Sequence, residues 1–277
     1  MTESHPTPRE LTGPRVLGAA AAAVVVVLIV VKILTHVLAP RLLTHYERFP
    51  ALAHAPKRTV DVKGTDADPV NVVLVGTEDE ITGAFRAAGW TVADSLSRAS
   101  DIAIAKSVLL NRPDSAAPVS SLFLFDRRQD LAYEQEVGPS ARRRHHVRLW
   151  RDRELTYGGR PVWIGGATYD ARAGLSHRGL HPTHHIAPDI DEERDGLEEA
   201  LANAGQVRET FRVTGIGVRV DAHNAEGDRY DTDGEQRVVV VSPGNVRHAP
   251  PADPGVPFLV AMKDRFWRWG HHLRRAT

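Results

Sequence analysis

Histidines gather in one part of this 277-residue chain: six of the fourteen lie between His145 and His185. The first group is in the sequence RRRHHVRLW, residues 142–150. If this stretch is a strand, its alternation places His146, Arg148 and Trp150 on one face. An imidazole, a guanidinium and an indole together would suit an anionic ligand, phosphate included, because arginine binds such groups through two hydrogen bonds. The alternative is a solvent-exposed polar face with Trp150 packed at its edge.

The second group lies in a predicted loop that leads into a helix. It consists of His177, His181, His184, His185, Asp189 and Asp191. Neutral imidazoles and carboxylates form a ligand set for zinc, manganese or iron, and a His–Asp pair can also act in acid–base catalysis near neutral pH. The alternative is that Asp189 or Asp191 caps the helix while the histidines are solvated or hydrogen-bonded locally. The sequence has no H-E-x-x-H motif.

These two groups supply the candidate site residues. The candidates for a divalent metal site are His184, His185, Asp189 and Asp191, and those for a catalytic site are His146, Arg148, His184, His185, Asp189 and Asp191. Other chemistries lack their motifs. The chain has no cysteine, which excludes disulfides, thiolate metal sites and cysteine nucleophiles. It also has no G-x-S-x-G and no glycine-rich cofactor loop, so no cofactor-binding residues are assigned.

The elements that must position these residues begin with a βαβ-like unit. Residues 70–75 form an apolar run typical of a buried strand. Thr77 and Glu80 have the spacing of a capping box, and apolar residues then recur at helical spacing up to Gly89, a C-terminal cap. Trp90 begins another extended segment. The sequence therefore predicts strand, helix and strand in this order.

The rest of the domain is predicted as a mixture of helices and strands. Helices are expected at 100–110 and 189–204, the second ended by Gly205. Strands are expected at 121–125, 131–134, 146–150, 161–167, 207–213 and 236–241. These elements predict a mixed α/β fold.

The same blocks carry a family resemblance. Four blocks occur in an order that resembles the LssY C-terminal domain family. They are SLFLF (121–125) with RQDLA (128–132), RHHVRLW (144–150), VWIG (162–165) with Asp170, and HHI (184–186) through Asp195. The resemblance covers about residues 68–242. It implies a bacterial domain without an established activity, often found beside membrane-embedded domains such as DedA-like proteins and lipid phosphatases. The chain lacks the signature motifs of those phosphatases and a polytopic domain.

Two functional hypotheses follow. The first is an accessory or ligand-binding domain beside lipid or envelope machinery, where a membrane-embedded protein could be its partner. The second is a hydrolase, for example of a phosphorylated substrate, that uses the His, Arg and Asp candidates. Nucleic acid is not expected as a partner, because 35 basic residues are balanced by 35 acidic ones.

An apolar run from Val16 to Ala39 predicts a single transmembrane helix. About 24 residues at 1.5 Å each would cover roughly 36 Å, enough for a ~30 Å hydrocarbon core. The alternative is a signal peptide. More Lys and Arg residues follow the run than precede it, which favours a cytoplasmic C-terminal domain at the cell membrane.

The C-terminus predicts a basic amphipathic helix. Leu259, Met262, Phe266, Trp269 and Leu273 form one apolar stripe, flanked by arginines, that could lie on an anionic membrane or pack on the protein's own domain. The predicted organisation is a tail (1–15), a transmembrane helix (16–39), a juxtamembrane segment (40–63), the α/β domain (64–243), a Pro-rich linker (244–257) and this helix (258–274).

Overall fold

The computed structural model describes residues 13–34, 38, 42–93, 122–138, 143–178, 182–242 and 256–275. The chain forms two compact units, residues 1–44 and 45–277. The first contains α1 (Gly13–Ile33). Of the helices in the described residues, none combines the length and the apolarity needed to cross a membrane. The predicted helix at 100–110 and the Pro-rich linker, apart from residues 256 and 257, lie outside the described residues, as does most of the N-terminal tail.

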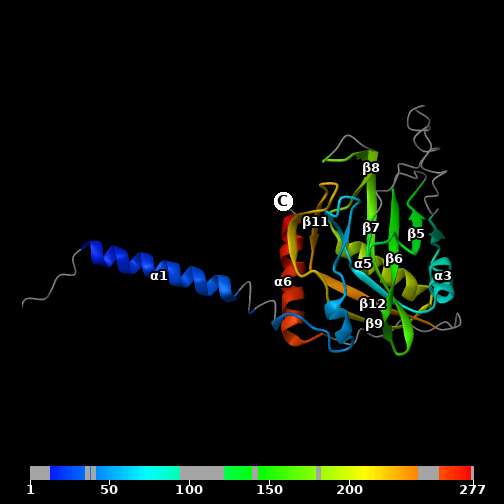
Figure 1. Ribbon diagram of the computed structural model, residues 1–277, viewed down its shortest axis with the longest axis horizontal. Coiled ribbons are helices and arrows are strands. Elements are labelled where there is room, and N and C mark those ends of the chain that lie inside the picture. Colours follow the sequence, from blue (N-terminus) through cyan, green and yellow to red (C-terminus); the bar gives the residue numbers. More distant parts are fainter. Residues whose placement is uncertain are drawn as a thin grey trace, which may run out of the picture. The chain divides into compact units, whose positions relative to one another are not determined.

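The second unit is built on one large sheet (Figure 1). Its strands run in the order β4-β5-β6-β7-β3-β12-β9, with β8 also paired to β7. They are β3 (Val72–Val75), β4 (Thr91–Val92), β5 (Leu131–Glu136), β6 (Arg144–Tyr157), β7 (Arg160–Leu175), β8 (Pro182–Ile186), β9 (Val207–Thr214) and β12 (Glu235–Val241). Every pair is antiparallel except β3 with β12. The expected mixed α/β fold is confirmed.

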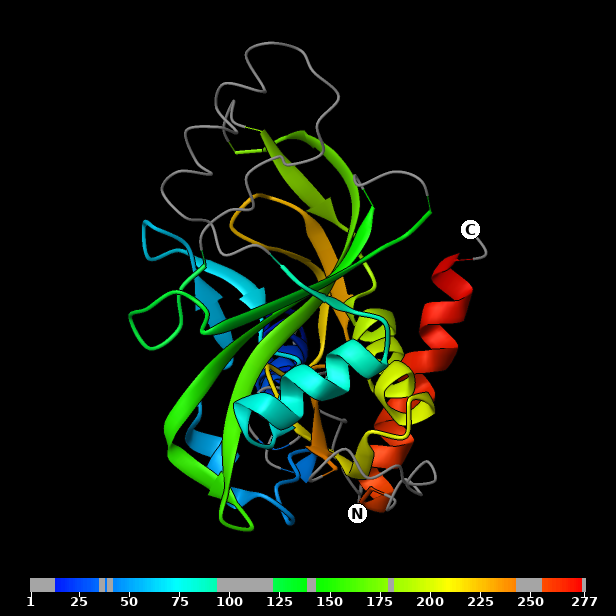
Figure 2. The same ribbon diagram turned by 90° about the vertical axis from the view of Figure 1, so that its right-hand side faces the viewer.

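Both faces of the sheet are covered by apolar side chains. On one face α3 (Glu78–Ala87) and α5 (Ile190–Asn203) pack against Leu74 and Leu149 (Figure 2). On the other face Val73 and Trp150 belong to a cluster with the 3-10 helix η2 (Pro50–His54). Burial on both faces explains why β3 reads as an unbroken apolar run rather than an alternating one.

Two small two-stranded sheets complete the unit. β1 (Arg58–Val60) pairs with β2 (Asp66–Pro69), and β10 (Arg219–His223) pairs with β11 (Arg229–Thr232). The compact unit begins at His45, so it includes residues expected to form a juxtamembrane segment. Phe49 and Leu52 from that segment are buried in the core.

The predicted strand, helix and strand occur in the expected order as β3, α3 and β4, and the capping prediction for α3 is confirmed, but the two strands are not neighbours as they would be in a βαβ unit. Thr77 accepts from the Glu80 amide, and the Glu80 carboxylate accepts from the Thr77 amide at 2.7 Å. Gly89 follows the helix with φ +82°, which favours glycine. However, β4 lies at the edge of the sheet, separated from β3 by β5, β6 and β7. A local strand–helix–strand pattern cannot reveal which strands become neighbours.

Two further expectations are corrected. Residues 122–125 do not form a strand: Phe123 and Leu124 make isolated bridges, and Phe125 enters a turn with positive φ, while Ser121 lies outside the described residues. Conversely, the predicted loop before α5 contains a strand, since residues 182–186 pair with β7 as β8. Pairing with the long β7 strand, rather than local propensity, makes this short polar segment extended.

The C-terminal helix α6 (Phe258–Arg275) packs on the unit through a face other than its apolar stripe. Val260 and Asp264 are buried, and Asp264 accepts from Arg212 Nη1 at 2.7 Å. Lys263 Nζ donates to Glu235 Oε1 at 2.7 Å. The stripe residues Leu259, Met262, Phe266 and Trp269 are exposed, Trp269 by 65%. The helix is therefore docked, yet its described apolar stripe faces solvent.

Candidate functional site

The β6–β7 hairpin brings polar side chains together on one face of the sheet. Arg144 lies opposite Asp170, and His146 lies opposite Thr168. Directly opposed residues of an antiparallel pair share a face, and alternation adds Arg148 to it. Trp150 shares that face but is fully buried in the apolar cluster, where its indole N–H donates to the Arg127 carbonyl at 2.9 Å. The His146 imidazole and the Arg148 guanidinium thus belong to a polar group, and the Trp150 indole is separate from it.

A small hollow of about 40 Å³ opens beside this polar group and is partly open to solvent. Its walls come from β2, β6, β7, β8 and the turn between β10 and β11. The polar lining residues are Asp61, Asp68, Arg148, Thr168, Asp170, Thr183, His184, Asn224 and Glu226. Among the sequence candidates, Arg148 and His184 therefore line one hollow, and His146 lies in the same strand as Arg148.

Carboxylates outnumber cations in the lining of the hollow, with Asp61, Asp68, Asp170 and Glu226 against Arg148. Asp170 Oδ2 accepts from Arg144 Nε at 3.0 Å. Arg148 Nη1 lies 3.8 Å from Asp68 Oδ2, and Asp68 Oδ1 accepts from Asn224 Nδ2 at 3.0 Å. Each guanidinium faces a carboxylate, so the lining has no surplus of positive charge.

Burial shifts the protonation of three groups. Burial raises the pKa of Asp68, although Arg148 and the hydrogen bond from Asn224 oppose the shift. Burial, with the nearby guanidinium groups of Arg148 and Arg144, holds the pKa of His146 well below its ordinary value. Burial also lowers the pKa of His184, whose Nδ1 has no hydrogen-bond partner among the described residues. Both imidazoles are therefore neutral near pH 7.

His185 belongs to a second cluster beside the hollow. Its Nδ1 lies 2.6 Å from Asp228 Oδ1, and His177 Nε2 lies 3.5 Å from the same oxygen. Asp228 was not among the sequence candidates. Asp228 lies 43 residues after His185 and follows a polar turn. Nothing in the local sequence pattern relates Asp228 to His185. The histidine-rich segment therefore divides between two clusters, because His184 and His185 are consecutive residues of β8.

Asp189 and Asp191 lie in other interactions. Asp189 is the N-cap of α5 and accepts from the Glu192 amide at 3.1 Å, which confirms the predicted cap, whereas His184 and His185 are buried rather than solvated. Asp191 accepts from Thr232 Oγ1 at 2.6 Å and from the Asp233 amide at 2.7 Å. The structure thus assigns both carboxylates to positioning α5.

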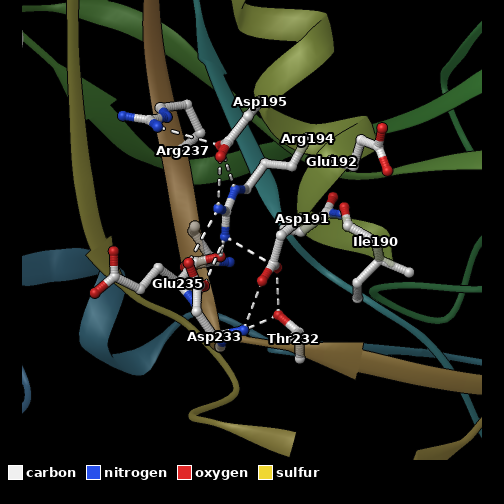
Figure 3. Close-up of polar contacts among 12 residues, drawn as sticks. Ile190, Asp191, Glu192, Arg194, Asp195, Thr232, Asp233, Glu235 and Arg237 are labelled. Carbon is white, nitrogen blue, oxygen red and sulfur yellow. Dashed lines mark hydrogen bonds and ion pairs between the residues drawn. The ribbon is translucent and has the colours of Figure 1, made fainter. Parts of the chain in front are cut away.

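Asp191 is part of a buried ionic cluster around Arg194 (Figure 3). Arg194 Nη1 lies 3.2 Å from Asp191 and 2.7 Å from Asp233, and its Nε lies 2.8 Å from Asp195. Burial raises the pKa of Asp191 to about 7, although Arg194 opposes the shift. The contacts join α5 to the turn between β11 and β12, so the cluster has a structural role.

Comparisons with known proteins give one family match. A family model described as LssY C-terminus matches residues 52–235, about two thirds of the chain. The match begins within η2, includes the hollow and the Arg194 cluster, and ends at the first residue of β12. No curated protein and no solved structure shows significant similarity to the chain.

Proposed function

The chain belongs to the LssY C-terminal family. From this premise and the geometry of the hollow, we propose that it is a membrane-attached domain that binds a small, polar, hydroxyl-bearing ligand. The observation that carries the proposal is the pairing of donors and acceptors in the hollow. Asp68, Asp170 and Glu226 offer carboxylate oxygens, while Arg148, Thr168 and Thr183 offer donors. A hydroxyl group both donates and accepts, so it matches such a lining.

The charge of the lining, in which carboxylates outnumber cations, favours this ligand class over a phosphate. Recognition of a dianion needs cationic donors that are not already facing carboxylates. Here Arg144 bonds Asp170, Arg148 faces Asp68, and the lowered pKa of His184 keeps its imidazole neutral. The anionic ligand suggested by the sequence group around His146 is therefore the less favoured of the two.

A calorimetric titration tests the ligand class. Glycerol, myo-inositol and simple glycosides would be titrated into the protein beside inorganic phosphate. We expect binding of at least one hydroxyl-bearing compound, weakened at least tenfold by Asp170→Asn. Asp66→Asn, in an exposed ion pair with Arg58, is the matched control and should leave binding unchanged. Binding of phosphate alone would contradict the proposal.

Membrane attachment is proposed from both ends of the chain. The apolar run at 16–39 is long enough in sequence for a single-pass anchor, and the Lys and Arg residues beyond it favour a cytoplasmic domain. The exposed stripe of α6 adds a second contact. Phe266 and Trp269 are exposed beside the exposed Arg265 and Arg268, a combination that suits an anionic lipid surface.

Vesicle flotation tests the second contact separately from the anchor. A chain that begins at His45, the start of the compact unit, would be mixed with phosphatidylglycerol or phosphatidylcholine vesicles. We expect flotation with the anionic vesicles, lost in the double variant Phe266→Ser, Trp269→Ser. Val62→Ser, at another exposed apolar residue, is the control. Equal flotation of all variants would contradict a role for α6.

Protease digestion of the domain from outside spheroplasts would contradict the cytoplasmic orientation.

A hydrolase is the second candidate function. The observation that favours it is a neutral imidazole, His184, in a hollow that also contains Asp68, whose pKa is raised. Two groups with environments of this kind can share acid and base roles. A panel of phosphate-ester and carboxyl-ester substrates tests it. Turnover that disappears in His184→Gln would favour the hydrolase over the binding domain.

A further inference from the structure

His177, His185 and Asp228 form a cluster that the proposed ligand-binding role does not use. One donor atom from each residue lies within 4.8 Å of the other two. His185 and Asp228 are buried, whereas the His177 side chain is 51% exposed. His177 lies in the turn after β7, His185 in β8 and Asp228 in the turn before β11, so the tertiary fold brings them together.

The separations of the donor atoms are close to those around a metal ion. Four ligands at about 2.0–2.2 Å from a tetrahedral cation lie roughly 3.4 Å from one another. The distance from His177 Nε2 to Asp228 Oδ1 is 3.5 Å. The distance from His185 Nδ1 to the same oxygen is 2.6 Å, a hydrogen bond that would lengthen by less than about 1 Å as a cation replaced the shared proton.

The backbone positions the cluster without using the oxygen that faces the histidines. Asp228 Oδ2 accepts from the Ile186 amide at 3.2 Å, while Oδ1 faces both imidazoles. The Asp228 amide donates to Asn224 Oδ1 at 2.9 Å, and the His177 amide donates to the Glu226 carbonyl at 3.1 Å. Such supporting hydrogen bonds orient the ligands of metal sites.

Two glycines make room for the imidazoles. A Cβ at Gly174 would lie 2.8 Å from His185 Nε2, and a Cβ at Gly227 would lie 2.9 Å from His177 Cβ. Gly227 also has φ +86°, a conformation that favours glycine. The close approach of both histidines to Asp228 therefore depends on residues without a side chain.

From these contacts we propose that His177, His185 and Asp228 bind a divalent transition-metal ion of the zinc class. Two nitrogens and one oxygen suit Zn²⁺, Co²⁺ or Fe²⁺ better than Mg²⁺ or Ca²⁺, which prefer oxygen ligands alone. Because His177 lies at the surface, a fourth position would be open to water, the arrangement of zinc sites with three protein ligands. The site is independent of the ligand class proposed for the hollow.

Metal titration of the full chain tests the site directly. Protein treated with a chelator and dialysed would be titrated with Zn²⁺ by calorimetry and with Co²⁺ by visible absorption. We expect about one ion per chain at the site. His177→Ala should weaken binding at least tenfold, and because His177 is half exposed this variant should still fold. Asp228→Asn, which retains the size of the side chain, should weaken binding at least as much.

A second histidine variant separates the site from adventitious binding. His54 lies exposed on η2, and His54→Ala should leave both the stoichiometry and the affinity unchanged. The Co²⁺ absorption bands should disappear in His177→Ala and persist in His54→Ala. A wild-type chain that binds no metal would overturn the proposal, as would equal affinity in wild type, His177→Ala and Asp228→Asn. These measurements use no organic ligand. A negative result for the metal site is therefore distinguishable from a negative result for binding of a hydroxyl compound in the hollow.

Discussion

Asn224 and Asp68 are joined by a hydrogen bond of 3.0 Å across 156 residues of sequence. The same Asn224 side chain accepts from the Asp228 amide at 2.9 Å. One amide group therefore links the hollow, which Asp68 lines, to the His177–His185–Asp228 cluster. Asp68 and Asp228 are both buried, so the loss of Asn224 would affect the two sites together.

We expect Asn224→Leu to destabilise the chain by about 1–3 kcal/mol, because a buried carboxylate and a buried amide would each lose a hydrogen bond. Urea unfolding measures the change. In the same variant, Zn²⁺ affinity and binding of the hydroxyl-bearing ligand should both decrease. A decrease in only one of the two would contradict the link through Asn224.

The Arg194 cluster gives a prediction about stability alone. Arg194→Met should cost about 3–5 kcal/mol, because it leaves the buried carboxylates of Asp191 and Asp233 without their cation. Arg58→Met, which breaks an ion pair with the 62% exposed Asp66, should cost about 0–1 kcal/mol. Thermal unfolding of both variants checks the contrast, and equal costs would contradict a buried structural role for Arg194.

The buried His146 predicts a dependence of stability on pH. Its pKa is lowered by burial, so below about pH 6.5 the unfolded chain takes up a proton that folded His146 does not. The contribution of His146 to stability therefore decreases as the pH falls, by at most about 1.4 kcal/mol for each pH unit. Urea unfolding between pH 7 and pH 5 should show the advantage of wild type over His146→Gln shrinking with acidity. A constant difference would show that His146 is not held neutral.

Two glycines should respond to alanine in opposite directions. A Cβ at Gly165, on β7, would overlap the carbonyl oxygen of Arg148 on β6, so Gly165→Ala should destabilise the sheet by several kcal/mol, in the range of severe core changes. At Gly196, on the exposed side of α5, a Cβ meets nothing within 4 Å. Gly196→Ala should stabilise by about 0.5–1 kcal/mol, because alanine favours helix. Thermal unfolding of the two variants side by side would reveal whether β6 and β7 approach as closely as described.

The sequence by itself determined features whose physical cause lies within a few residues. The Thr77–Glu80 capping box and the Asp189 cap depend on groups three residues apart, and the helices begin where they predict. Strand alternation likewise places Arg148 on the same face as His146. The family was also recognisable, because its blocks are local segments in a fixed order.

Tertiary structure decided what those side chains contact. It joined His185 to Asp228 rather than to Asp189, and it joined Asp191 to the Thr232 hydroxyl and the Asp233 amide. It also turned the apolar stripe of α6 to solvent while Asp264 became buried against Arg212. The Asp228–His185 and Asp264–Arg212 contacts join residues more than 40 positions apart in sequence, and they depend on how a turn and a helix pack against strands of the large sheet. Strand order is set by packing of the whole core, which no short stretch of sequence contains.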